Sequence, residues 1–112
     1  MNRNNLDLLI DSLEDGTVYG KDVRFRMDFF VLENYCGTAA CLAGHCALLG
    51  RMEDYNHGGV FDFAMDWLEI PFSIAKPMFL EPGELKYAQI TTAVAVKMLE
   101  NFRATNKVEW SL

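Results

Sequence analysis

The feature that most constrains the fold of this chain is the run of small and apolar residues from Cys36 to Gly50. It holds all three cysteines and one of the two histidines. Thr38 can cap a helix, because its hydroxyl can accept a hydrogen bond from a free amide of the first turn. Alanine and glycine then recur on one helical face, and leucine and cysteine on another. Apolar residues on most sides indicate burial, so we predict a central, buried helix over Thr38–Leu49.

The remaining sequence predicts further amphipathic helices around this one, in residues 5–15, 28–34, 60–70, 73–80 and 91–104. We therefore expect a mainly α fold, a small bundle of about four or five helices around the buried central helix. Residues 23–26 alternate between apolar and basic side chains, which indicates an extended segment. A minor two-stranded ribbon with Lys107–Trp110 is an open option for this segment.

Length and charge limit the classes of protein to consider. A chain of 112 residues is long enough for one modest core, so we expect residues 1–112 to form a single domain. The formal net charge of −6 argues against direct binding to nucleic acid or to an anionic membrane, and it permits a basic partner. No secretory leader or membrane-spanning run is visible, so we expect a cytoplasmic protein with reduced thiols.

The cysteines and histidines allow three interpretations. The first is packing in the core, where free cysteine behaves as a small hydrophobe. The second is a zinc site formed by Cys36, Cys41, His45 and His57, although the spacing lacks the paired ligands of a strong zinc motif. The third is catalysis by Cys36 at a helix N-terminus, with His45 or His57 as its base. We favour core packing, and so expect no cofactor and no enzymatic activity.

The segment Cys36–His45 resembles the C-G-T-x-x-C-[apolar]-A-G-[W/H] signature of a family of small, uncharacterised proteins from phages and prophages. Residues 90–110 and the stretch Trp67–Ile70 are also similar to that family, with Glu69 in place of a glycine. Cys46 is not part of the signature. The resemblance implies an origin in a phage or mobile element, and hence a bacterial host cytoplasm, but it supplies no mechanism.

Two stripes of acidic residues follow helical spacing. Such stripes are usually the solvated outer faces of amphipathic helices. Carboxylates one turn apart can also imitate a phosphate backbone and meet the basic groove of a nucleic-acid-binding protein. The two stripes are Asp7, Asp11 and Glu14, and Asp62, Asp66 and Glu69.

Phe63 lies off the apolar stripe of its predicted helix. We therefore expect it in an exposed patch that contacts a protein partner or a second copy of the chain. Together, the acidic stripes, the small size and the resemblance lead us to expect a phage-encoded accessory protein that binds and modulates a host protein. That host protein would be a nucleic-acid-binding defence factor, inhibited in the manner of an anti-CRISPR protein. The alternative is a small zinc- or thiol-dependent module that uses Cys36, Cys41 and His45.

Overall fold

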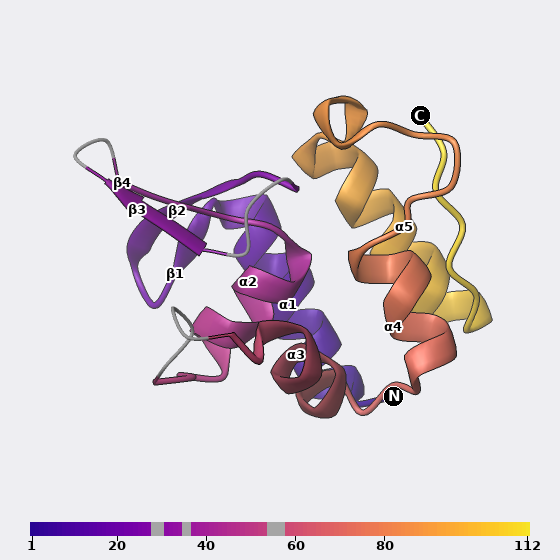
Figure 1. Ribbon diagram of the computed structural model, residues 1–112, viewed down its shortest axis with the longest axis horizontal. Coiled ribbons are helices and arrows are strands. Elements are labelled where there is room, and N and C mark those ends of the chain that lie inside the picture. The colour runs from indigo at the N-terminus through magenta and orange to yellow at the C-terminus, as the bar shows by residue number, and fades with distance from the viewer. Residues whose placement is uncertain (28–30, 35–36, 54–57) are drawn as a thin grey trace.

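The computed structural model describes residues 1–27, 31–34, 37–53 and 58–112 (Figure 1). It is a mainly α structure, which confirms the expected fold class. The sheet lies at one end of the molecule, α4 and α5 lie at the other, and α1 and α2 lie between them. The elements in chain order are α1 (Arg3–Asp15), β1 (Thr17–Val18), β2 (Lys21–Phe25), β3 (Val31–Asn34), β4 (Gly37–Ala40), α2 (Leu42–Leu49), α3 (Val60–Leu68), α4 (Phe72–Phe79), the 3₁₀ helix η2 (Tyr87–Gln89) and α5 (Thr92–Thr105).

The central helix α2 is buried as expected, but it begins at Leu42 and not at Thr38. Thr38 lies in β4, which stands between β2 and β3 in the sheet. A strand with neighbours on both sides pairs its backbone groups in both directions, and this outweighs the capping preference of one threonine. Cys41 takes the capping position instead, and its Sγ accepts a hydrogen bond from the amide of Gly44 at 3.4 Å.

The sheet is larger than the predicted ribbon, and its partners differ from the predicted ones. Its described strands follow the order β1-β2-β4-β3. β2 runs parallel to β4, with Val23 opposite Thr38, while β1–β2 and β3–β4 are antiparallel. Residues 107–110 form no strand, so the predicted pairing of the two ends of the chain is wrong. Residues 31–34 form a strand where we predicted a helix, because β4 supplies the hydrogen-bonding partner that local periodicity cannot reveal.

The ends of the other helices follow local signals. Asn2 caps α1 by accepting a hydrogen bond from the Asn5 amide at 3.0 Å. Gly16 ends α1 in the left-handed region, at φ 71°, as glycine does without steric cost. Thr91 caps α5, with its hydroxyl 3.3 Å from the amide of Val94.

The core is formed by the inner faces of the helices and one face of the sheet. α1 packs against both α2 and α5, and α2 packs against α3. The amide of Asn2 donates to the Leu68 carbonyl at 2.7 Å and joins the start of α1 to the end of α3. Of the helices in the described ranges, none is long and apolar enough to cross a lipid bilayer. The largest fully buried side chains include Leu6, Leu42, Phe79, Met98 and Phe102.

Candidate functional site

The structure brings together two of the predicted zinc or thiol residues, Cys41 and His45. The Nδ1 atom of His45 lies 2.8 Å from the backbone carbonyl oxygen of Cys41. A carbonyl oxygen only accepts hydrogen bonds, so Nδ1 carries the proton and Nε2 presents its lone pair. Cys36 and His57 lie outside the described residues. The zinc and thiol interpretations that depend on them therefore stay predictions.

Burial controls the ionisation of this region. The His45 side chain is almost fully buried, and this burial lowers its pKa, against the opposing effect of its backbone hydrogen bonds. Burial also raises the pKa of the Cys46 thiol well above its ordinary value, and the nearby Cys41 adds to this shift. Within the described ranges, no group of three His, Cys, Asp or Glu side chains is placed to hold a metal ion. The described part of this region therefore favours a neutral histidine and a protonated Cys46.

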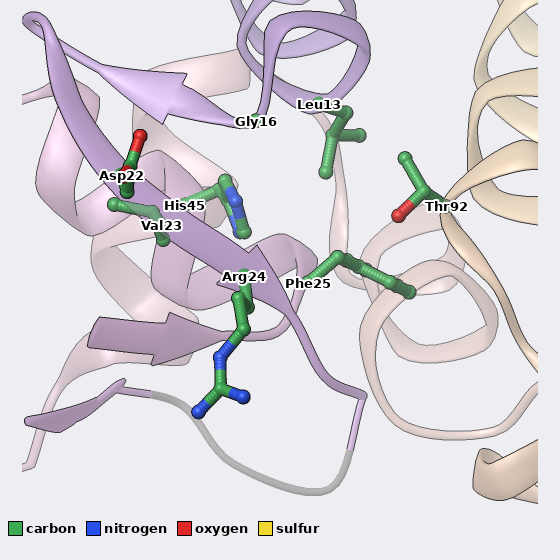
Figure 2. Close-up of a pocket in the computed structure, with 8 residues that line it drawn as sticks. All are labelled: Leu13, Gly16, Asp22, Val23, Arg24, Phe25, His45 and Thr92. Carbon is green, nitrogen blue, oxygen red and sulfur yellow. The ribbon is translucent and has the colours of Figure 1, made fainter. Parts of the chain in front are cut away.

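A cavity of about 470 Å³ lies beside His45 (Figure 2). This volume falls within the range of small-ligand sites, which is about 300–1,000 Å³. The cavity forms where the end of α1, strand β2, helix α2 and the start of α5 meet. The ring of Phe25 lies 6.1 Å from the imidazole of His45, centroid to centroid. The cavity is lined by Leu13, Gly16, Asp22, Val23, Arg24, Phe25, His45 and Thr92.

The strand that borders this cavity has a free backbone edge. The amide of Arg26 donates to the carbonyl of Ala40 in β4. Every second residue of a strand directs its backbone groups to the same side, so Arg24 also directs its amide and carbonyl toward β4. Val23 and Phe25 therefore direct theirs to the opposite side. The Val23 amide bonds the Gly16 carbonyl at 3.0 Å, but the Gly16 amide is taken by Ser12 at the end of α1. In the described part of the chain, the Val23 carbonyl and the amide and carbonyl of Phe25 form no hydrogen bond with another backbone group.

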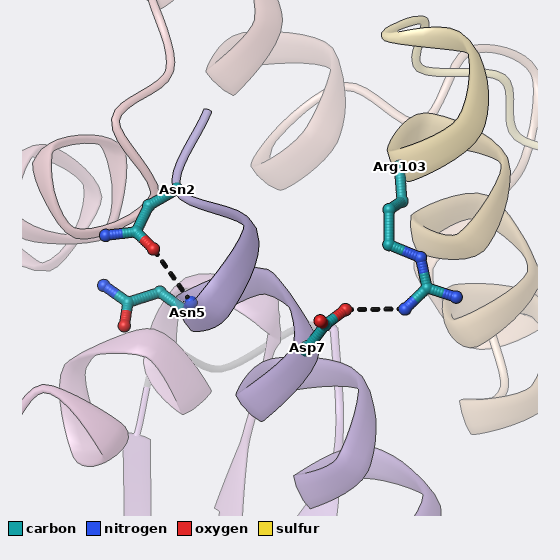
Figure 3. A network of polar contacts seen from close by, with 4 residues as sticks. All are labelled: Asn2, Asn5, Asp7 and Arg103. Atoms are coloured by element: carbon teal, nitrogen blue, oxygen red, sulfur yellow. Dashed lines mark hydrogen bonds and ion pairs between the residues drawn. The ribbon is translucent and has the colours of Figure 1, made fainter.

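The acidic stripe on α1 is partly neutralised within the molecule. Asp7, Asp11 and Glu14 are all exposed, as predicted for an outer face. Asp7 accepts a hydrogen bond from the guanidinium of Arg103 on α5 at 2.6 Å, as Figure 3 shows. That hydrogen bond, together with the charges of Asp7, Glu100 and Asp11, raises the pKa of Arg103. This stripe is therefore joined to α5.

The acidic stripe on α3 stands clear of basic side chains. Asp62 and Asp66 are exposed one turn apart, and Glu69 is exposed at the left-handed C-cap of the helix, at φ 54°. Among the residues that the structure describes, no lysine or arginine forms an ion pair with any of these three carboxylates. We call Asp62, Asp66 and Glu69 the α3 acidic face.

Phe63, the aromatic residue expected in an exposed patch, is only partly exposed. Phe63 is half buried, and a Cβ atom added at Gly50 would come within 2.6 Å of its ring. It therefore packs onto the end of α2. Phe72, in the first turn of α4, is more exposed, at 59%, and its ring lies edge-on to that of Phe61 with the centroids 6.0 Å apart. The available signal was Pro71, which places Phe72 in the first turn of a new helix.

Comparisons with protein-family models, with curated proteins and with solved structures gave no match.

Proposed function

We propose that this protein is a phage- or mobile-element-encoded accessory protein that binds a basic surface of a host protein through the α3 acidic face. The observation that carries the proposal is the unpaired state of Asp62 and Asp66 in the described structure. An unpaired carboxylate has no internal partner to lose when it meets a lysine or arginine. Asp7, in contrast, would first have to leave Arg103.

The geometry of α3 supports a contact with more than one cation. Carboxylates at positions i and i+4 of a helix have Cβ atoms about 5–6 Å apart, so Asp62 and Asp66 point in the same direction. Their charges act together with the net charge of −6 to steer a basic partner toward the molecule. A nucleic-acid-binding groove is a common basic surface of this kind, which is why a nucleic-acid-binding defence factor is our proposed class of host partner.

An aromatic pair gives the same region an apolar component. Phe61 and Phe72 stand edge-to-face beside the α3 acidic face, and Phe72 exposes more than half of its surface. Interfaces gain much of their affinity from a few aromatic anchors, while charges around them contribute mainly to specificity and rate of association. We therefore assign Phe72 the role of anchor and the α3 acidic face the role of selecting a basic partner.

The test is a capture experiment with a host-cell lysate, followed by affinity measurement with the purified partner. We expect the triple variant Asp62→Asn, Asp66→Asn, Glu69→Gln to bind about threefold to a hundredfold more weakly, because each of the three lost ion pairs contributes about 0.2–1 kcal/mol. The matched control, Asp11→Asn, Glu14→Gln, Asp15→Asn, changes the charge equally on α1 and should retain binding. Equal binding by the wild-type chain and the α3 variant would refute the proposal.

A further inference from the structure

We propose that the free edge of β2 beside His45 binds an extended peptide segment of a partner protein, which adds a strand to the sheet. The site is distinct from the α3 acidic face and does not depend on the function proposed above. It combines unpaired backbone groups with an adjoining cavity that can receive a side chain (Figure 2). Strand addition uses these two components, because main-chain hydrogen bonds give affinity and side-chain pockets give specificity.

The backbone part of the site consists of one residue, Phe25, which can pair with one residue of the peptide. Phe25 directs both its amide and its carbonyl away from β4, so an antiparallel peptide residue opposite it can exchange two hydrogen bonds with it. Residues 16–18 cover the earlier part of this edge, because Thr17 lies opposite Asp22 and the Gly16 carbonyl accepts a hydrogen bond from the Val23 amide. The incoming segment would therefore pair with β2 beyond Val23.

The cavity determines where the peptide side chain goes. Side chains directly opposite each other on neighbouring strands lie on the same face of a sheet. Phe25 lies on the face that packs toward His45, with the two rings 6.1 Å apart. The peptide residue opposite Phe25 would thus direct its side chain into the cavity between His45, Leu13 and Thr92, the last of which lies across from β2 in Figure 2.

The polar groups of the cavity indicate the chemistry of that side chain. Cys41 holds Nδ1 of His45, so Nε2 is the nitrogen left for a ligand, and it accepts a hydrogen bond while the ring is neutral. The hydroxyl of Thr92 can donate or accept. Leu13 and Phe25 supply apolar walls. We therefore expect a side chain with a hydroxyl or a carboxamide at this peptide position, rather than a carboxylate, which would meet the lone pair of Nε2.

The test uses the full-length chain labelled with ¹⁵N and short peptides selected from a displayed random library. Binding should slow solvent exchange of the Phe25 amide by about tenfold or more, because the amide gains a hydrogen bond. A scan with N-methylated versions of the selected peptide should weaken binding about tenfold at the one position whose amide donates to the Phe25 carbonyl. The positions on either side of it should tolerate N-methylation, because their amides point away from β2. This scan leaves the protein unaltered, so its result does not depend on how a variant folds.

Two matched variants complete the design. Thr92→Tyr should fill the cavity and weaken peptide binding, whereas Ala93→Tyr, at an exposed position of the same helical turn, should not. The triple variant of the α3 acidic face should bind the peptide as the wild-type chain does, which separates this site from the function proposed above. The proposal is refuted if no selected peptide protects the Phe25 amide or if N-methylation weakens binding equally at neighbouring positions. Protection that rises with protein concentration alone would also refute it, by showing that a second copy occupies the edge.

Discussion

The imidazole of His45 is bonded through Nδ1 to the carbonyl oxygen of Cys41, the residue that caps the same helix. This carbonyl also accepts the first hydrogen bond of the helix, from the His45 amide at 2.8 Å. The buried imidazole of His45 is therefore fixed in the tautomer that carries its proton on Nδ1.

We expect the stability of the protein to fall as the pH drops below the ordinary histidine pKa of 6.5. Burial lowers the pKa of His45 in the folded state, so the unfolded chain binds the proton first as the pH falls. The stabilisation is complete above pH 6.5 and decreases until the folded imidazole is also protonated. Urea unfolding of a His57→Gln variant between about pH 5 and 8 measures this effect. An NMR titration of His45 with a midpoint at or above 6.5 would contradict it.

The thiol of Cys46 should not react in the folded protein. Its side chain is fully buried and its pKa is raised by that burial, so little thiolate forms and no reagent reaches it. Site-resolved mass spectrometry after brief alkylation at mildly alkaline pH should find Cys46 unmodified, and modified once urea unfolds the chain. Rapid modification under native conditions would instead place Cys46 in a reactive site.

Replacing Gly50 should show that Phe63 is part of the α2–α3 contact. A Cβ atom at this position would come within 2.6 Å of the Phe63 ring and 3.0 Å of Trp67, so Gly50→Ala should cost about 1–3 kcal/mol of stability. The cost should shrink in a Phe63→Leu background, because part of the clash is removed. A double-mutant cycle by chemical denaturation measures the coupling. Additive effects would mean that the two positions do not touch.

The ion pair between Asp7 and Arg103 should have a small effect that depends on salt. Both side chains are partly exposed to solvent, where ions screen their attraction. Arg103→Gln should therefore lower the midpoint of thermal unfolding slightly at low ionic strength and leave it unchanged in high salt. Lys97→Gln, which removes the same charge from an exposed position of α5, is the matched control. An effect of Arg103→Gln that persists in high salt would show that the contact contributes by packing.

The sequence determined most of the helical framework. Periodic apolar residues and nearby stop and start signals located α1, α3, α4 and α5 to within a few residues, because helix hydrogen bonds join residues close in the chain. Gly16, Pro71 and Thr91 each mark a helix boundary through their own backbone or side-chain chemistry. The burial of α2 was also predictable, since polar residues are nearly absent from its surface.

The tertiary structure decided what depended on partners far apart in the chain. Residues 37–40 became a strand because β2 and β3 pair with them from either side, and a local pattern does not record such partners. Phe63 packs beside Gly50 at the end of α2, whereas Phe72 is largely exposed to solvent. Both outcomes depend on which residues of other elements lie next to each ring. The cavity beside His45 formed because α1, β2, α2 and α5 meet there. Helices arise from local hydrogen bonds, whereas sheets, cavities and surfaces arise from contacts that only the folded chain creates.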